Sequence, residues 1–406
     1  MLKNKMLEYK KSEYKSINKK VCSNCVGERY LKQFVIDNGK CDKCDYCGSD
    51  EICISVEDLI SEIISGIEYE YDRAVDTMSW DHGEYVGAKT WDTYNLIYDK
   101  LGCELPLEDD LIKDIYETID DDTWCERDPY QLRESIDKAL LWDDFCEMVK
   151  TKTRYVFFRM PKKDEYREEA NFNVLDYIGK KVTELNLITS IPENTTFFRG
   201  RMHSSSMVLD EAKNLCSPPS HCAKSNRMSA EGISIFYGAN DVKTAIAEIY
   251  NSQYKYATVA PFVNLRNLIL VDLTKVEDIE FPSLFDKEKR KYRQALDFFI
   301  KLNENLTQPI ENMVSIEYIP AQIIAEYFRY IYCYNGISID GIAYRSSKNS
   351  GGICYSLFFN YEQCLEVDRD KRCKEEQELK IDKSGINTYA VSVDVSFSQS
   401  YNRLFI

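Results

Sequence analysis

Two pairs of cysteines near the N-terminus constrain this chain more than any other feature of its sequence. Each pair has the pattern Cys-x-x-Cys, and 18 residues separate Cys22 and Cys25 from Cys44 and Cys47. A Cys-x-x-Cys turn presents two thiolates from one backbone knuckle, and two knuckles supply the four soft ligands of a tetrahedral zinc site. The spacing predicts a zinc knuckle with a structural role, because four protein ligands leave no open position for catalysis.

Two alternatives stay open for these cysteines. Cys41 stands three residues before Cys44 and forms a competing Cys-x-x-Cys pair, so Cys41 is a second candidate for the same knuckle. The second alternative is that the thiols are reduced and bind no metal. A redox role is not favoured, because no βαβ pattern surrounds the cysteines. Gly48 follows the second pair, at a position where such a knuckle often needs a positive φ.

The charge balance limits the partners that we expect. The 406 residues include 68 acidic and 52 basic side chains, which gives a net charge of −16. Nucleic acids and anionic membranes repel such a chain, so we expect neither as a partner. No stretch approaches the roughly 20 apolar residues of a membrane span. The N-terminus also lacks the apolar core of a secretory signal, and we expect a cytoplasmic protein.

The segment after the cysteines has the periodicity of amphipathic helices. Ser55 and Asp58 form a capping-box pattern, and apolar residues recur at helical spacing from there to about Tyr69. Asp128 followed by Pro129 predicts the start of a further helix. The residues that we expect on its buried face are Leu132, Ile136, Leu140 and Phe145.

The second half of the chain predicts a mixed α+β domain. Expected strands lie at 196–198, 233–236, 256–259, 268–273 and 355–359, and expected helices at 241–252, 286–304 and 320–332. We therefore predict an α+β protein in five parts. These are a zinc knuckle (1–54), a helical domain (55–150), a connecting segment (151–192), the α+β domain (193–365) and a C-terminal extension containing a strand (366–406).

Five segments of the second half carry the candidate chemistry. They are Phe-Phe-Arg-Gly-Arg at 197–201, the run 226–238, Thr-Ala-Ile-Ala-Glu at 244–248, the run 339–347 and the glycine pair at 351–352. In this order they resemble the RES domain family, which is named after its Arg, Glu and Ser. The cysteine-rich and helical half resembles the HEPN/RES N-terminal domain that precedes some RES domains. One departure is Asn226, where the family often has glycine.

The resemblance implies a fold similar to ADP-ribosyltransferases and an enzyme that consumes NAD. The implied reaction is phosphorolysis or hydrolysis of the nicotinamide–ribose bond, with inorganic phosphate as a candidate co-substrate. Many members of the family are toxins, which implies a toxin or defence role and an inhibitory antitoxin as partner. Protein ADP-ribosylation is the first alternative, and a non-catalytic nucleotide-binding zinc module is the second. Rossmann and P-loop patterns are absent from the sequence, so we expect NAD as a substrate in a cleft.

Four residues are the candidates for the catalytic roles. Glu248 can stabilise the positive charge that grows on the ribose as nicotinamide leaves. Arg199 occupies the arginine position of the family, and a guanidinium matches a phosphate better than an ammonium does. Tyr237 stands 11 residues before Glu248, as in the family, and can stack on a nicotinamide or adenine ring and offer its hydroxyl to the ribose or a phosphate. Ser346 matches the family's serine and is expected to hydrogen-bond a phosphate or the nicotinamide amide rather than to act as a nucleophile, since no histidine lies in a serine-hydrolase pattern.

Three further residues are candidates for substrate binding. Arg201 lies two residues after Arg199 on the same expected strand face, so either arginine is a candidate for the phosphates. We expect Arg227 in the same pocket, and Ser347 stands directly beside Ser346.

Overall fold

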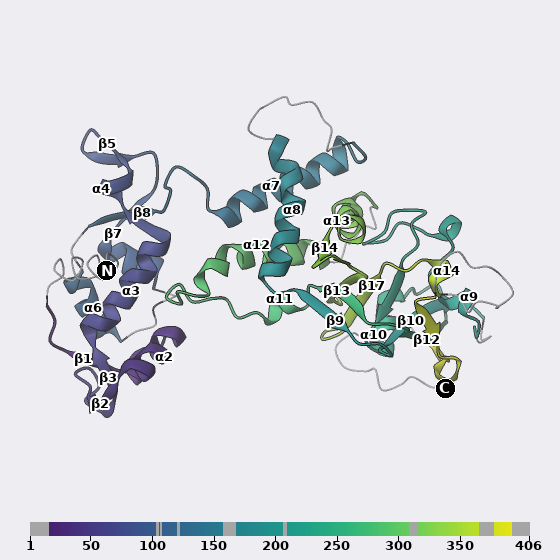
Figure 1. Ribbon diagram of the computed structural model, residues 1–406, viewed down its shortest axis with the longest axis horizontal. Helices are drawn as coiled ribbons and strands as arrows, with labels where there is room; N and C mark the ends of the chain where they lie inside the picture. Colours follow the sequence, from purple (N-terminus) through teal and green to yellow (C-terminus); the bar gives the residue numbers. More distant parts are fainter. Residues whose placement is uncertain are drawn as a thin grey trace. The chain divides into compact units, whose positions relative to one another are not determined.

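The computed structural model describes residues 16–102, 105, 108–119, 122–156, 168–205, 209–307, 315–364 and 377–391 (Figure 1). Two compact units emerge from the contacts along the chain. The first combines Met1–Glu134 with Phe281–Gln294, and the second combines Ser135–Glu280 with Ala295–Ile406. Both units contain helices and strands, and the predicted α+β class is confirmed. Within the described residues, no helix has the length and apolar character needed to cross a membrane.

A small antiparallel sheet carries the cysteines of the first unit. Its order is β1 (Lys20–Cys22), β3 (Asp50–Ser55) and β2 (Lys40–Lys43), and the 3₁₀ turn η1 (Ser23–Cys25) follows β1 directly. Helix α2 (Arg29–Asn38) lies between β1 and β2 in the chain and begins where the Glu28 carboxylate accepts from the N–H of Leu31, at 2.7 Å. It ends at Gly39, where a Cβ would stand 2.5 Å from the carbonyl oxygen of Val35.

The helix predicted after Ser55 is confirmed as α3 (Val56–Glu70). The Ser55 hydroxyl accepts from the N–H of Asp58 at 3.1 Å, which satisfies one of the free donors of the first turn. The apolar stripe of α3 is buried in the core of the unit. Further elements of this unit are β4 (Tyr71–Arg73), α4 (Ala74–Thr77), β5 (Ser79–Asp81), β6 (Glu84–Val86), β7 (Thr90–Asp92), α5 (Thr93–Asn95), the π-helical turn η2 (Leu96–Lys100), α6 (Asp109–Thr118) and β8 (Thr123–Glu126).

Residues 281–294 complete this core although they come from the second half of the chain. Leu284 and Phe285 are each only 1% exposed within it. The ring of Phe285 packs directly against Gly66 of α3. A Cβ at Gly66 would stand 2.4 Å from that ring, so only glycine allows this contact. Arg293 adds an ion pair with Glu70 at 2.9 Å. The segment also contains the 3₁₀ turn η5 (Arg290–Tyr292).

The second unit is built on one large sheet. Its strand order is β18-β12-β10-β11-β17-β16-β13-β9, and β19 pairs with β12 on the side that β18 also uses. Every pairing is antiparallel except that of β13 with β16. The strands are β9 (Ile188–Ile191), β10 (Thr196–His203), β11 (Phe236–Ala239), β12 (Tyr256–Asn264), β13 (Leu268–Asp272), β16 (Gly341–Arg345), β17 (Ile353–Leu357), β18 (Leu379–Ile381) and β19 (Asn387–Ala390).

The helices and smaller elements of this unit connect these strands. They are α7 (Glu134–Thr151), α8 (Glu168–Glu184), α9 (Ala212–Leu215), η4 (Ser220–Cys222), α10 (Val242–Ile249), α11 (Lys275–Asp278), α12 (Arg293–Thr307), η6 (Ser315–Tyr318), α13 (Ile319–Tyr330), β14 (Cys333–Tyr334), β15 (Ile337–Ser338), α14 (Tyr361–Cys364) and η7 (Lys383–Gly385). Each of the five expected strands overlaps an observed strand, and the three expected helices correspond to α10, α12 and α13. Residues 392–406 of the expected C-terminal extension lie outside the described residues.

The helix expected to start at Pro129 differs from the prediction. It begins only at Glu134, because Asp128 adopts a φ of +55° and the chain turns there. Three of the four residues expected on its buried face are exposed, namely Leu132, Ile136 and Leu140 at 57%, 42% and 50%. Phe145 is buried, together with Trp142, Met148 and Val149, so the packed surface of α7 follows the aromatic residues of its second half.

Helix α10 packs closely on β10, and this contact positions the site described below. Asp241 caps the helix by accepting from the N–H of Thr244 at 2.8 Å. The close approach requires Gly200 on β10, because a Cβ there would stand 2.6 Å from the side chain of Ile249. Glu248, near the end of α10, is therefore held against the face of the sheet while its own side chain stays exposed.

Candidate functional site

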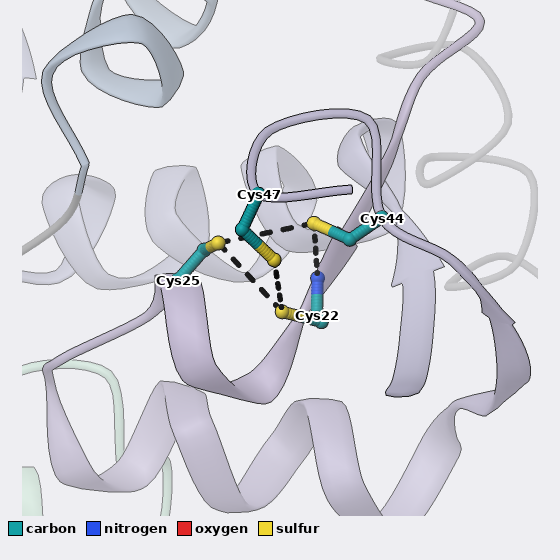
Figure 2. Close-up of side chains that lie close together, drawn as sticks. All are labelled: Cys22, Cys25, Cys44 and Cys47. Atoms are coloured by element: carbon teal, nitrogen blue, oxygen red, sulfur yellow. Dashed lines mark hydrogen bonds between the residues drawn. The ribbon is translucent and has the colours of Figure 1, made fainter. Parts of the chain in front are cut away.

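Four cysteine side chains converge in the first unit (Figure 2). Cys22 and Cys25 come from β1 and η1, and Cys44 and Cys47 from the loop between β2 and β3. Their sulfur atoms all lie within 4.8 Å of one another. The Cys22–Cys25 and Cys22–Cys47 sulfurs are 3.6 Å apart, and the Cys25–Cys44 sulfurs 3.8 Å.

These distances fit a metal held by four thiolates. Zn–S bonds of about 2.3 Å in a tetrahedron place the sulfurs about 3.8 Å apart, which matches the observed separations. The backbone N–H of Cys22 also points to the sulfur of Cys44, at 3.4 Å. Gly48 has the positive φ expected for the knuckle, at +72°. Cys41 lies on β2, is exposed, and does not belong to the cluster.

The second unit contains a cavity of about 410 Å³ lined by residues of β10, β11, α10, β16, β17, the turn at Arg227, the loop after β16 and the start of α13. Five of the seven site residues expected in this half line it, namely Arg199, Arg227, Tyr237, Glu248 and Ser347. The two that do not line it are Ser346 and Arg201.

Ser346 does not line the cavity itself but is hydrogen-bonded to Glu248, which does. Its hydroxyl donates to the Glu248 carboxylate at 2.5 Å and accepts from the N–H groups of Lys348 and Asn349 at 3.1 and 3.0 Å. Asn349 in turn donates to the hydroxyl of Thr244 on α10, at 2.7 Å. The loop after β16 is thus tied to α10 at two points, and the serine fixes one carboxylate oxygen of Glu248.

Arg199 is a partly buried cation of the cavity, and backbone carbonyl oxygens surround it. Its guanidinium donates to the carbonyl oxygens of Leu215 and Tyr237 at 2.9 and 2.7 Å and lies over the ring of Phe236. In the described part of the chain, no carboxylate forms an ion pair with it. Removal from water lowers the pKa of Arg199, as expected for a charge that the protein itself does not neutralise.

Arg227 is the second cation of the cavity, and it too forms no ion pair with a described carboxylate. Its guanidinium donates to the carbonyl oxygen of Leu306 at the end of α12 and lies 5.9 Å from the ring centre of Tyr318. The turn that carries it is fixed by Gln322 of α13, whose amide nitrogen lies 2.8 Å from the Asn226 carbonyl oxygen and 3.1 Å from that of Ser229.

Asn226 occupies a position where the family often has glycine. Its N–H donates to the carbonyl oxygen of Ser229 at 2.8 Å, which closes the turn around Arg227. Asn226 is not among the described residues with a positive φ, so a side chain at this position causes no backbone strain. The departure from glycine therefore leaves the turn intact.

Tyr237 connects this turn to the sheet. Its hydroxyl accepts from the N–H of Met228 at 3.2 Å and lies 3.0 Å from the hydroxyl of Ser229. Burial raises the pKa of Tyr237 to about 12, so the phenol stays protonated at neutral pH. Tyr237 thus holds the backbone beside Arg227 while its ring lines the cavity.

Arg201 lies apart from the other two arginines. It is exposed on β10 and donates to the carbonyl oxygen of Asn214 at 2.6 Å. Arg199 and Arg201 share a strand face, yet only Arg199 lines the cavity.

The cavity also includes residues that the sequence did not single out. These are chiefly Tyr318, Tyr344, Lys348 and Cys354. Burial, and then the nearby Glu248 carboxylate, raise the pKa of the Cys354 thiol, so this cysteine is a neutral part of the cavity wall. Tyr344 lies in the motif run 339–347 and Cys354 stands one residue before the strand expected at 355–359, which was the only signal for them. Tyr318 had no signal, because nothing distinguishes it among 29 tyrosines.

Comparison with protein families gives two matches. Residues 37–163 match HEPN/RES N-terminal domain 1, and residues 208–382 match the RES domain. The chain therefore joins a HEPN/RES N-terminal domain to a RES domain, and the predicted resemblance is confirmed. Cys22, Cys25 and Arg199 precede the matched segments, so their assignment depends on the geometry described above. No curated protein and no solved structure matches the chain.

Proposed function

We propose that this protein is an NAD-consuming enzyme that cleaves the bond between nicotinamide and ribose. The observation that carries the proposal is the charge distribution of the cavity. Arg199 and Arg227 line it without a carboxylate partner among the described residues, although the chain has a net charge of −16. Two such guanidinium groups favour a ligand with two negative charges, which is what the diphosphate of NAD carries.

The proposed chemistry uses Glu248 on the same cavity. As the glycosidic bond breaks, its electron pair leaves with the nicotinamide nitrogen, and nicotinamide departs as a neutral molecule. Positive charge then develops on the ribose, and the Glu248 carboxylate stabilises it. An oxygen of water or of inorganic phosphate forms the new bond to the ribose carbon, and the attacking group releases its proton to solvent. In this scheme Ser346 orients the carboxylate rather than attacking the substrate.

Incubation of the purified protein with NAD, followed by chromatography, tests the proposal. Nicotinamide with ADP-ribose indicates hydrolysis, and nicotinamide with ADP-ribose 1″-phosphate indicates phosphorolysis. With NAD that carries a label in its ADP-ribose part, label transferred to protein would instead favour the alternative, protein ADP-ribosylation. Unchanged NAD would reject the enzyme and favour a nucleotide-binding module.

The RES domain also supports a toxin or defence role in which the protein depletes cellular NAD. Expression in a host cell should then arrest growth and lower the NAD content, whereas the Glu248→Gln variant should do neither. An inhibitory antitoxin and a cytoplasmic location follow from this role and stay predictions. Growth arrest that is equally strong with the variant would contradict the role.

We also propose that the four cysteines hold one structural zinc ion. The sulfur distances support a tetrahedral thiolate site, and zinc is the usual metal for four cysteines in two knuckles. The bound metal would stabilise the small sheet by joining β1 to the loop between β2 and β3. Metal analysis of the purified protein should find about one zinc per chain.

A further inference from the structure

We propose that Tyr318 is the surface on which the adenine ring of NAD stacks, and that it determines the preference for an adenine-containing substrate. This inference rests on the proposed function. It names the residue that would recognise the adenosine half of NAD, which is remote from the bond that breaks.

The position of Tyr318 is fixed by the start of α13. Tyr318 is the last residue of η6, and the next two residues, Ile319 and Pro320, are buried. Proline in the first turn sets the backbone direction there. Tyr318 itself is only partly buried and lines the cavity. A partly exposed ring beside buried backbone is suited to stacking, because a ring that the protein already half surrounds has less freedom to lose on binding.

Tyr318 and Arg227 form one composite surface. The guanidinium of Arg227 lies 5.9 Å from the ring centre of Tyr318, within the range of a cation–π contact. Gln322 stands one helical turn after Tyr318 on α13 and fixes the turn that carries Arg227. The start of α13 therefore positions both the Tyr318 ring and the Arg227 guanidinium. A cation able to bind a phosphate and an aromatic ring lie next to each other as a result.

Charge decides which ring of NAD this surface would accept. The nicotinamide ring of NAD carries a positive charge, so it is disfavoured beside the guanidinium of Arg227. Adenine is neutral and stacks well on tyrosine and on guanidinium planes. Glu248, the carboxylate suited to the cationic end, lines the same cavity as Arg227, and the two form no ion pair among the described residues.

Equilibrium binding of ADP-ribose to the full-length protein tests the inference without requiring any reaction. Tyr318→Ala should raise the Kd for ADP-ribose by roughly 5- to 150-fold, the loss expected for one base stacked on an aromatic side chain. Tyr318→Phe keeps the ring and should bind within about twofold of the wild type. In the cleavage assay, Tyr318→Ala should raise KM for NAD, and it should leave kcat/KM for nicotinamide mononucleotide, which has no adenine, unchanged.

Tyr330→Ala is the matched control. Tyr330 lies at the other end of α13, is 67% exposed and does not line the cavity, so its loss should change neither binding nor cleavage. Thermal unfolding should confirm that every variant is folded. Equal Kd values for ADP-ribose in the wild type and in Tyr318→Ala would overturn the inference, and so would an equal loss with nicotinamide mononucleotide.

The outcome also separates this inference from the proposed function. A wild type that cleaves NAD but shows no effect of Tyr318→Ala would reject the stacking residue alone. A wild type that binds ADP-ribose through Tyr318 without cleaving NAD would reject the enzyme and support the stacking. A wild type that does neither would reject both.

Discussion

The two candidate sites of this protein are built in opposite ways. The cysteine cluster draws its four ligands from 26 consecutive residues, and short turns present them in pairs. The cavity draws its residues from five strands and helices, β10, β11, α10, β16 and β17, and from the turn at Arg227, the loop after β16 and the start of α13, over more than 150 residues of chain. The first site depends on local spacing and the second on the packing of a whole sheet.

The difference extends to charge. Four thiolates within 4.8 Å of one another would repel, so the proposed cation would stabilise the cluster by neutralising their charge. In the cavity, by contrast, Arg199 and Arg227 keep their charges without a carboxylate partner in the described chain, and hydrogen bonds to carbonyl oxygens hold them. The comparison suggests that loss of a cysteine should mainly lower stability, while loss of a cavity residue should mainly lower activity.

The largest expected effect is that of Cys44→Ser on stability. This change removes one of four thiolates and should reduce the metal content from about one ion per chain to nearly none. Since such a metal contributes several kcal/mol, the unfolding midpoint of the first unit should fall by roughly 10 °C or more. Metal analysis and calorimetry provide the readouts.

Cys41→Ser is the matched control for that experiment. Cys41 is exposed on β2 outside the cluster, so both metal content and unfolding should match the wild type. Metal retained by Cys44→Ser but lost from Cys41→Ser would reverse the assignment of the second knuckle.

The next largest effect should come from Glu248→Gln. The amide nearly keeps the shape of the side chain but loses the charge that stabilises the ribose cation, so kcat should fall about 10²- to 10³-fold. Thermal stability should stay within a degree or two, unlike that of Cys44→Ser. Glu231→Gln serves as control, because Glu231 is exposed and does not line the cavity. Near-normal turnover in Glu248→Gln would remove this residue from the mechanism.

A smaller effect is expected for Arg199→Lys, and it should appear in KM. An ammonium cannot replace two directed bonds to the carbonyl oxygens of Leu215 and Tyr237 and also contact a phosphate, so KM for NAD should rise about tenfold or more. Arg201→Ala should be close to wild type, because Arg201 is exposed and outside the cavity. The opposite result, with only Arg201→Ala impaired, would show that the wrong arginine has been chosen.

The smallest effect should be that of Ser346→Ala. Glu248 keeps its charge but loses the hydrogen bond that orients it, so kcat should fall roughly tenfold. Ser350→Ala, an exposed serine of the same loop, provides the comparison. Complete loss of turnover in Ser346→Ala would favour a direct chemical role for this hydroxyl over the positioning role.

The contrast between the sites also explains what the sequence could predict. The cysteine spacing singled out all four members of the cluster, because a Cys-x-x-Cys turn fixes two ligands by local geometry, but it left Cys41 open as an alternative to Cys44. Glu248 and Ser346 could be singled out from motif order, but their mutual hydrogen bond could not. Arg201 shows the limit of strand periodicity, which finds the shared face of β10 and not where along that face the cavity ends.

Tertiary packing decided the features that the sequence did not predict. Tyr318 and Gln322 enter the site because α13 packs beside the turn of Arg227, a contact between segments about 90 residues apart. Helical spacing placed Leu132, Ile136 and Leu140 on the buried face of one helix, yet all three side chains are exposed and Leu132 lies before the helix begins. Periodicity reveals which residues share a face, and only the packed structure reveals whether the face is covered.

The insertion of residues 281–294 into the first unit has a consequence for synthesis of the chain. A ribosome that has made the first unit up to Glu134 has not yet made Leu284 and Phe285, which complete its core. At about 5–20 residues per second, this delay lasts roughly 10–30 s. The cysteine knuckle, whose last ligand is Cys47, can bind metal long before that time, whereas α3 keeps an apolar surface uncovered. A nascent chain of this protein is therefore expected to need protection from aggregation until residues 281–294 have left the ribosome.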